Sequence, residues 1–500
     1  MSVAIKAWRC VPCGYIHRGE APPDLCPVCG AGRDDFEPVG TDKAAAAASS
    51  GVRWECRKCG YIHTGDTPPD LCPVCGAGPD QFDRLANVPA ATGAPGVKDR
   101  VVIVGGGIAG IAAAESMRKA GMAGPVTIIS SEEEPPYYRI NLTRFLAGEV
   151  TLDALVLHPA PWYHDQRINL MRGETARSID LAAREVHLLS GDTVPFDRLI
   201  LTPGAHAFVP PLAGADREGV LGVRTLAQSR RIANDLHPGL VVVVIGGGLL
   251  GLETAAALAA HGAAVTVVEV FEWLLPRQLD RPAAAVLERH VRGLGIDLVL
   301  GGQVQELPGD ERVTGVTLKD GRTIPADLVI VCIGVRPNID LARRAGLKVN
   351  KGIVVDDHLR TSHPAVFAAG DAIEHRGVVT GTWSPAFFQG RIAGLNAAGQ
   401  ATEYGGLAPS YAIKVLGISM LSMGTIEPPD PACTVLTRAE TGLYQKLIFQ
   451  GPRLVGAILL GDAAAGPAVK KAIENHIDLS AILASKPDAR EILKALAQPR

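Results

Sequence analysis

Eight cysteines near the N-terminus have the spacing of metal ligands. Residues 8–36 and 54–82 are identical at 21 of 29 aligned positions, and each copy carries two Cys-x-x-Cys pairs. The cysteines are Cys10, Cys13, Cys26 and Cys29 in the first copy, and Cys56, Cys59, Cys72 and Cys75 in the second. Four thiolates at this spacing can close a tetrahedral site that suits zinc or iron. Each copy is too short for a sufficient hydrophobic core, so we expect the metal to hold its fold.

Aromatic residues accompany each set of cysteines and favour iron over zinc. They are Trp8, Tyr15 and Phe36 in the first copy, and Trp54, Tyr61 and Phe82 in the second. The string CGYIH-x-G-x-x-PPDLCPVCGA, present in both copies, resembles rubredoxin, and above all the short rubredoxin-like domain of rubrerythrins. Free-standing rubredoxins have a longer segment between the cysteine pairs. The resemblance implies one FeS4 centre in each copy, and a pair of zinc ribbons is the alternative.

Two glycine-rich turns further along the chain predict two dinucleotide sites. In each, an apolar strand runs into Gly-x-Gly-x-x-Gly, and an alanine-rich helix, a second strand and an acid follow. The glycines are Gly105, Gly107 and Gly110 in the first unit, and Gly246, Gly248 and Gly251 in the second. Glycines let the backbone approach a pyrophosphate, which binds the N–H groups at the helix N-terminus. The acids, Glu132 and Glu269, are placed to bind ribose hydroxyls.

The acid of the second unit also bears on the choice of pyridine nucleotide. The charge of Glu269 would repel a 2′-phosphate, and no arginine follows at once in the segment VVEVFEW. We therefore expect NADH rather than NADPH as the reductant.

Three further motifs resemble the pyridine nucleotide–FAD oxidoreductase family, in which the FAD and NAD domains are nested. They are LILTPGA at 199–205, VCIGVRPN at 331–338 and VFAAGDA at 366–372. The resemblance implies that Gly334, Gly370 and Asp371 bind cofactor, with Asp371 at the ribityl chain of FAD. It also implies that Glu253, in GLLGLE, lies near the nicotinamide.

Two more segments resemble those that surround the flavin in this family. Residues 136–149 match a segment with an Arg at the FAD pyrophosphate, here Arg139, and a Lys near the flavin ring, here replaced by Arg144. Residues 383–394 match the helix whose N-terminus faces the flavin pyrimidine, and this helix begins at Trp383. The resemblance thus implies Arg139 and Trp383 as cofactor-binding residues, and Arg144 and Glu253 as catalytic ones.

The remaining cysteines separate this chain from the disulfide reductases of that family. No cysteine lies between Cys75 and Cys332, Cys332 lies in an apolar strand, and Cys433 has no partner motif. Electrons must therefore leave the flavin by another route, and the two cysteine modules are the expected acceptors. Residues 100–485 resemble the NADH:rubredoxin oxidoreductases and the flavin part of assimilatory nitrite reductases.

The expected function is electron transfer from NADH through FAD to two fused iron centres and on to an external protein. Candidate acceptors are a rubrerythrin, a superoxide reductase, a flavodiiron protein or an alkane hydroxylase. A hydride carries two electrons, so one NADH would load both irons. The alternative is an NADH-sensing flavoprotein whose zinc-ribbon modules dock a partner. A third possibility is a reductase of an external acceptor with vestigial modules.

These residues require an α/β fold with nested FAD and NAD Rossmann-like domains and a C-terminal α+β domain, preceded by two small metal-bound modules. Buried strands are expected at 100–104 and 126–130, and again from residue 240. The domains expected are the modules at 1–40 and 52–85, an FAD domain at 99–211 and 335–407, an NAD domain at 212–334 and a C-terminal domain at 408–500. The linkers that follow the modules span about 20 Å, which lets a module reach the surface of the body.

Net charge and the length of the apolar runs limit the kinds of partner that we expect. The net charge is −3 with 20% charged residues, so no bulk attraction to nucleic acid or anionic lipid is expected. The longest apolar runs are too short to cross a bilayer, and residues 1–6 lack the apolar core of a signal peptide. We therefore expect a cytoplasmic protein without membrane insertion.

Overall fold

The structure is a computed structural model, and it describes the body of the chain almost throughout. The described residues are 98–406, 410–413 and 416–497, with short segments of the modules at 7–10, 16–18, 21–22, 33, 36–39, 53–56, 62–64, 67–68, 79 and 82–85. Within these ranges, no helix is both long and apolar enough to cross a membrane.

A five-stranded parallel sheet carries the first glycine turn. Its order is β25-β13-β7-β8-β9. The strands are β7 (Val101–Val104), β8 (Val126–Ser130), β9 (Ile168–Arg172), β13 (Arg198–Leu201) and β25 (Val366–Ala368). The strand expected at 126–130 is confirmed, and the one expected at 100–104 begins one residue later. Every residue of β7 is buried, as expected for a central strand of a parallel sheet that is covered on both faces.

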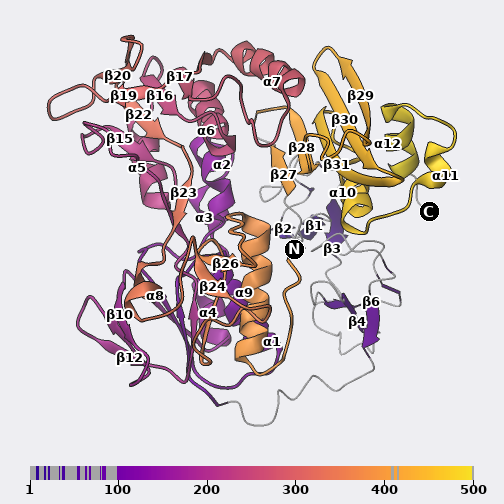
Figure 1. Ribbon diagram of the computed structural model, residues 1–500. Coiled ribbons are helices and arrows are strands. Elements are labelled where there is room, and N and C mark those ends of the chain that lie inside the picture. The colour runs from indigo at the N-terminus through magenta and orange to yellow at the C-terminus, as the bar shows by residue number, and fades with distance from the viewer. Residues whose placement is uncertain are drawn as a thin grey trace, which may run out of the picture.

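Two helices that are distant in sequence pack together on this sheet. They are α1 (Ile108–Lys119) and α9 (Trp383–Ala397), and Figure 1 shows them side by side. Glycines in α9 permit the close approach. A Cβ atom at Gly390 would lie 2.2 Å from the Ala109 carbonyl oxygen, and one at Gly394 would lie 2.3 Å from that of Ala113. This contact packs the first half of α1 against the middle of α9.

The second parallel sheet has the order β15-β22-β16-β17-β18 and carries the second glycine turn. Its strands are β15 (Val220–Gly222), β16 (Val241–Ile245), β17 (Ala264–Glu269), β18 (Asp297–Leu300) and β22 (Leu328–Val331). Its helices are α5 (Leu226–Asp235), α6 (Leu249–Ala260) and α7 (Arg281–Gly293). In sequence, this second sheet lies between strands β13 and β25 of the first sheet. In Figure 1 it lies above the first sheet. The nested α/β fold is therefore confirmed.

Smaller elements complete the two halves. Three-stranded antiparallel sheets are formed by β10 (Ala176–Asp180), β11 (Glu185–Leu188) and β12 (Thr193–Pro195), and by β19 (Val304–Glu306), β20 (Gly315–Leu318) and β21 (Thr323–Pro325). Two-stranded sheets pair β14 (Ala205–Ala207) with β23 (Val335–Pro337), and β24 (Ile353–Val355) with β26 (Ile373–His375). The short helices are η3 (Arg139–Asn141), α2 (Leu142–Leu146), α3 (Leu152–Leu155), α4 (Ala160–Asp165) and α8 (Asp340–Arg344).

The C-terminal part is a five-stranded sheet backed by helices, as the α+β expectation requires. The sheet has the order β27-β28-β31-β30-β29. Its strands are β27 (Ser410–Ile413), β28 (Ser419–Gly424), β29 (Thr434–Glu440), β30 (Leu443–Gln450) and β31 (Arg453–Gly461), and its helices are α10 (Gly466–Glu474), α11 (Ser480–Leu483) and α12 (Ala489–Ala497). One face of this sheet packs against α10 and α12.

The described strands of the two modules repeat one another. The first module has β1 (Ala7–Cys10), β2 (Ile16–Arg18) and β3 (Phe36–Val39), and the second has β4 (Arg53–Cys56), β5 (Ile62–Thr64) and β6 (Phe82–Leu85). In each sheet, the strand that comes first in sequence, β1 or β4, lies between the other two. The register is also the same, because Trp8 pairs with His17 and Trp54 with His63.

The other face of the C-terminal sheet shares a hydrophobic core with the NAD half. Leu416, Met420 and Ile458 belong to the same buried cluster as Leu258 and Leu287 of α6 and α7. The C-terminal sheet is therefore continuous with the NAD half through apolar packing.

A buried ion pair crosses the same interface. The Lys446 ammonium on β30 lies 2.9 Å from the Asp280 carboxylate, and both side chains are only 7% exposed. The same carboxylate oxygen accepts a hydrogen bond of 2.7 Å from the Tyr444 hydroxyl, and the other oxygen caps α7 through the N–H of Ala283. Lys446 also donates to the Ile426 carbonyl oxygen at 2.8 Å. The pair is thus fully hydrogen-bonded at the start of α7.

Replacing Lys446 with Met should reduce the free energy of unfolding by about 3–5 kcal/mol, since it leaves the buried Asp280 charge without its cation. Denaturant unfolding followed by circular dichroism measures this. The control is Arg322→Met, which removes one partner of a fully exposed pair with Asp320 and should change stability little. Equal changes in the free energy of unfolding for the two substitutions would show that the buried pair is no more important for stability than an exposed one.

Candidate active site

The three glycines of the first turn are required for different geometric reasons. Gly105 has φ +120°, and a Cβ atom there would lie 2.0 Å from the Thr202 carbonyl oxygen. A Cβ atom at Gly110 would lie 2.1 Å from the Gly105 carbonyl oxygen. Gly107, at the N-terminus of α1, differs because nothing lies within 4 Å of its Cβ position. The turn and the packing need Gly105 and Gly110, while Gly107 leaves open space for a ligand.

The second turn repeats this arrangement in the NAD half. Gly246 has φ +111°, and its Cβ atom would lie 2.5 Å from the Cys332 carbonyl oxygen. A Cβ atom at Gly251 would lie 1.9 Å from the Gly246 carbonyl oxygen, whereas one at Gly248 would meet nothing within 4 Å. Both helix N-termini therefore present free backbone N–H groups to open space, as a pyrophosphate site requires.

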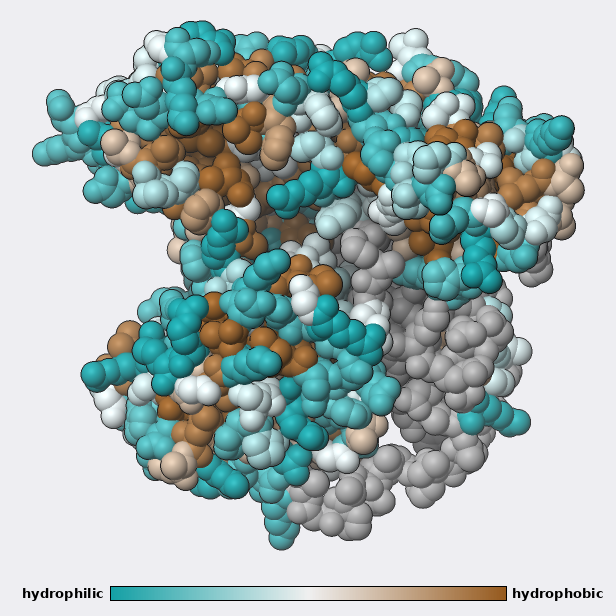
Figure 2. Space-filling view, viewed as in Figure 1, coloured by the Kyte–Doolittle hydropathy of each residue, from teal (hydrophilic) through white to brown (hydrophobic). Residues whose placement is uncertain are grey.

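A cavity of about 1030 Å³ begins at the first turn and runs toward the second. The surface in Figure 2 is hollowed between the two halves of the molecule. Gly105, Gly107 and Ile108 line one end, and Leu249 and Glu253 of α6 line another part. The cavity is large enough for a dinucleotide. Its walls fit FAD because Gly107 leaves room beside the N-terminus of α1.

Glu132 and Arg139 meet in this cavity. The Arg139 guanidinium lies 2.5 Å from the Glu132 carboxylate, and the Tyr137 hydroxyl donates to the same carboxylate at 2.7 Å. Burial and the negative charge of Glu132 raise the pKa of Tyr137 far above its usual range, so its hydroxyl stays protonated. The two residues predicted to bind FAD are thus adjacent, and each already holds a partner on its own chain.

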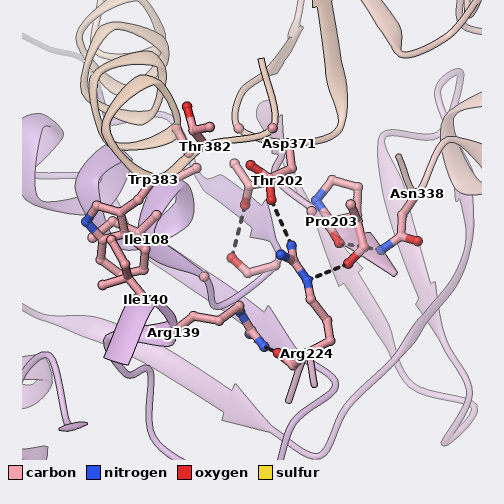
Figure 3. A pocket seen from close by; sticks show the side chains of 18 of the residues that line it. Ile108, Arg139, Ile140, Thr202, Pro203, Arg224, Asn338, Asp371, Thr382 and Trp383 are labelled. Atoms are coloured by element: carbon pink, nitrogen blue, oxygen red, sulfur yellow. Dashed lines mark hydrogen bonds and ion pairs between the residues drawn. The ribbon is translucent and has the colours of Figure 1, made fainter. Parts of the chain in front are cut away.

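Asp371 lies across the cavity, and its partner is an arginine that the sequence analysis did not single out. The Arg224 guanidinium lies 2.7 Å from the Asp371 carboxylate and donates to the Ala205 carbonyl oxygen at 2.9 Å. Arg139 in turn donates to the Arg224 carbonyl oxygen (Figure 3). Arg224 follows β15 and has no motif around it, so only the tertiary structure brings it to this site.

Gly370 and Trp383, also predicted to bind cofactor, lie on the cavity wall. Gly370 has φ +86°, and its N–H donates to the Gln389 side chain at 2.9 Å. Trp383 is the first residue of α9, and its ring centroid lies 5.9 Å from that of Tyr138. The N-terminus of α9 therefore faces the cavity, as Figure 3 shows beside Ile108 and Ile140.

Glu253 and Arg144, the two predicted catalytic residues, are not paired with one another. The Glu253 carboxylate accepts a hydrogen bond of 3.1 Å from the Thr143 hydroxyl. The Arg144 guanidinium instead lies 2.8 Å from the Glu149 carboxylate. Burial, together with the charge of Glu149, outweighs this hydrogen bond and raises the pKa of Glu253 to about 7. The resemblance implied a role for Arg144, but the residue that contacts the Glu253 carboxyl group in the structure is its neighbour Thr143.

Glu269 lies beneath the second glycine turn and is 7% exposed. Its carboxylate accepts hydrogen bonds from the N–H groups of Gly247 at 2.6 Å and Phe271 at 3.0 Å. The acid thus shapes the loop at the place where an adenosine ribose is expected. Val270 and Phe271, which follow it, are about half exposed and carry no charge.

The strand end that faces this turn holds Cys332 and Gly334. Cys332 is 8% exposed, and burial raises the pKa of its thiol to about 12. It is therefore a protonated core thiol, as expected. Gly334 has φ +107° and accepts a hydrogen bond from the Phe208 N–H at 2.9 Å.

The C-terminal domain contributes to the cavity as well. Tyr411 of β27 and Lys470 and Glu474 of α10 line it. Three separate parts of the chain therefore surround one space, and no sequence motif indicated the contribution of the C-terminal domain.

The predicted metal ligands lie outside the side chains that the structure describes. The backbone of two of them is described, with Cys10 at the end of β1 and Cys56 at the end of β4, opposite Phe36 and Phe82. Among the described residues, no group of three or more His, Cys, Asp or Glu side chains gathers as a metal site.

Comparison with protein families identifies the class of this protein. Residues 99–400 match the family described as pyridine nucleotide-disulphide oxidoreductase, so the chain belongs to that family of oxidoreductases. Residues 409–477 match the rubredoxin NAD+ reductase C-terminal domain. Residues 8–37 and 54–83 each match the rubrerythrin, rubredoxin-like domain.

Individual relatives agree with this assignment. The chain is 30% identical over 376 residues to NADH-rubredoxin oxidoreductase of Clostridium acetobutylicum, which covers 75% of this chain and 94% of that protein. The crystal structure of the Clostridium acetobutylicum enzyme matches with a TM-score of 0.66 and 28% identity, over 79% of this chain and 99% of that one. A nitrite reductase [NAD(P)H] of Bacillus subtilis is 33% identical over 77% of this chain, which spans only 48% of that relative.

Substituting Gly107 with Ala should weaken FAD binding by about 10- to 100-fold, the equivalent of one charge-assisted hydrogen bond. The added methyl group meets no protein atom, so the fold should persist while the group occupies the space of the pyrophosphate. Retained flavin after gel filtration, and fluorescence titration of the flavin-free protein, measure the effect. Gly293→Ala is the control, since its Cβ position is equally open but does not line the cavity. Undiminished flavin retention in Gly107→Ala would contradict this assignment.

Proposed function

We propose that this chain oxidises NADH and passes the electrons through FAD to two FeS4 centres in its own N-terminal modules. The observation that carries the proposal is the joining, in one chain, of two rubredoxin-like segments to a reductase with a rubredoxin NAD+ reductase C-terminal domain. Tethering gives the modules a high local concentration at the body, so strong electrostatic steering is unnecessary.

The described side chains support binding and orientation of two dinucleotides at one cavity. The N-terminus of α1 with Gly107 would hold the FAD pyrophosphate, and Arg139 and Arg224 supply the nearby positive charge. Asp371 would then bind the ribityl chain. The N-terminus of α9 at Trp383 would present its positive dipole end to a bound flavin. When bound, FAD supplies the exchange between the two-electron chemistry of nicotinamide and the one-electron chemistry of iron.

The NADH site rests on the second glycine turn. Gly248 leaves the N-terminus of α6 open for the NADH pyrophosphate, and Glu253 lies one turn further along the same helix inside the shared cavity. The nicotinamide would therefore lie between Glu253 and the flavin. Arg144 would act indirectly, because its guanidinium holds Glu149.

The iron centres and the partner follow from the modules. Eight cysteines in two sets of four would hold two iron ions, and thiolate sites of this kind persist in a reducing compartment such as the cytoplasm. The final acceptor would be an iron-dependent protein of the rubrerythrin, superoxide reductase or flavodiiron type. Two modules would accept the two electrons of one hydride.

An anaerobic NADH titration tests this proposal. Ferric FeS4 centres are red, and one equivalent of NADH should bleach both, because one hydride carries two electrons. In Cys56→Ser/Cys59→Ser, the same equivalent should bleach only the remaining centre. The spectrum, with iron and zinc analysis of protein purified without added zinc, provides the measurement.

Deletion of residues 1–98 is the control for that titration. The shortened chain should keep the yellow flavin and the reduction of ferricyanide by NADH, but lose the red absorbance. Zinc in place of iron, or red centres that NADH leaves unbleached, would refute the electron path. Full reduction of an external acceptor protein by the shortened chain would show that the modules are dispensable.

The preference for NADH over NADPH should depend on the surface beside Glu269. Val270 and Phe271, which follow Glu269, are exposed and supply no positive charge for a 2′-phosphate. Val270→Arg should raise kcat/KM for NADPH about tenfold, or about 1.4 kcal/mol, with little change for NADH. Val435→Arg, at an exposed position on the C-terminal sheet, is the matched control. A wild-type enzyme that already prefers NADPH would contradict the assignment.

A further inference from the structure

Glu253 differs from two other carboxylates that line the cavity, Glu132 and Asp371. Glu132 faces Arg139 at 2.5 Å, and Asp371 faces Arg224 at 2.7 Å. Glu253 faces no cation within salt-bridge distance among the described residues, and its hydrogen-bond partner there is the neutral hydroxyl of Thr143. Among the described residues, ionisation of this partly buried carboxyl group is therefore supported by one hydrogen bond.

The surroundings of Glu253 act on its proton in opposite directions. Burial has the largest effect and favours the protonated form, and the negative charge of Glu149 adds to it. The Thr143 hydroxyl opposes both, because it donates to the carboxylate. The result is a pKa of about 7, so the group gains or loses a proton near neutral pH. The other ionisable groups of the neighbouring walls are Arg144, Arg224, Asp371, Tyr411, Lys470 and Glu474.

The proposed reaction needs such a group. When NADH gives its electrons to one-electron acceptors, the balance is NADH → NAD+ + H+ + 2 e−. The hydrogen enters the cavity as hydride and must leave it as a proton. Glu253 lies one helical turn beyond Gly248, inside the cavity that also contains the N-termini of α1 and α9. The rim beside it opens to solvent at Leu250 and Ile140, which are 37% and 53% exposed.

We propose that the Glu253 carboxylate takes up the proton released by NADH oxidation and passes it to water, with Thr143 as the positioning residue that holds this carboxylate. The C–H bond that carries the hydride in NADH breaks, its two electrons pass to the one-electron acceptors, and the remaining proton forms an O–H bond on the Glu253 carboxylate. The same bond breaks when the proton moves to solvent. This inference rests on the proposed function for its electron flow, but it does not depend on which metal the modules hold.

Two substitutions beside Glu253 should move its titration in opposite directions. Thr143→Val removes the hydrogen bond to the ionised form, so the pKa of Glu253 should rise. Glu149→Gln removes a repelling charge, so this pKa should fall. Infrared difference spectra of the flavin-loaded protein without NADH, recorded from pH 5 to 9, report the carbonyl stretch of a protonated carboxylic acid. The band should vanish in Glu253→Gln and remain unchanged in Glu311→Gln, an exposed carboxyl control.

Turnover with ferricyanide, a small one-electron oxidant, tests the proton transfer without the modules. In wild-type protein, kcat should rise with pH through about 7, because the acceptor is the carboxylate. The midpoint of this profile should shift upward in Thr143→Val and downward in Glu149→Gln. Glu253→Gln should lower kcat by about 100-fold, with KM for NADH little changed and the pH dependence lost.

Other outcomes would overturn the inference. If Glu253→Gln raised KM for NADH at unchanged kcat, Glu253 would only bind the nicotinamide. If the infrared midpoints did not move, Thr143 and Glu149 would not control its proton. Because ferricyanide accepts electrons from the flavin directly, these results remain decisive even if the modules prove to hold zinc, which would refute only the proposed electron path.

Discussion

The structure depends on two places where the backbone folds back so tightly that only hydrogen can occupy the side-chain position. A Cβ atom at Gly110 or Gly251 would lie about 2 Å from the carbonyl oxygen of the first glycine in its own turn. This close approach aims the N-termini of α1 and α6 at open space. The cavity, the orientation of α9 and the position of Glu253 all follow from these two turns.

A second constraint holds the C-terminal domain in place. Its sheet shares a hydrophobic core with α6 and α7, and the Lys446–Asp280 pair lies in the same interface. Because α6 also carries Glu253, the C-terminal wall of the cavity and the NAD half should move together. Tyr411 and Lys470 line the same cavity as Glu253.

Some residues of the cavity could be predicted from the sequence, and others could not. The sequence could single out the glycines, Glu132, Arg139 and Asp371 because strand–glycine–helix spacing and short family motifs are local signals. The structure places Glu132, Arg139 and Asp371 at one cavity. Arg224, Thr143 and Lys470 were missed because they come from separate elements and carry no motif. The resemblance selected Arg144 of the segment 136–149. In the structure, Arg144 pairs with Glu149, and it is the neighbouring residue Thr143 that contacts Glu253.

The sequence by itself determined the class of chemistry, since cysteine spacing and glycine turns depend on neighbours a few residues away. It determined the α/β fold and the presence of two dinucleotide turns for the same reason. The tertiary structure alone decided that Glu132 and Asp371 have cationic partners whereas Glu253 has a hydroxyl partner. Protonation depends on burial and on charges brought together from distant segments, and no local spacing records that.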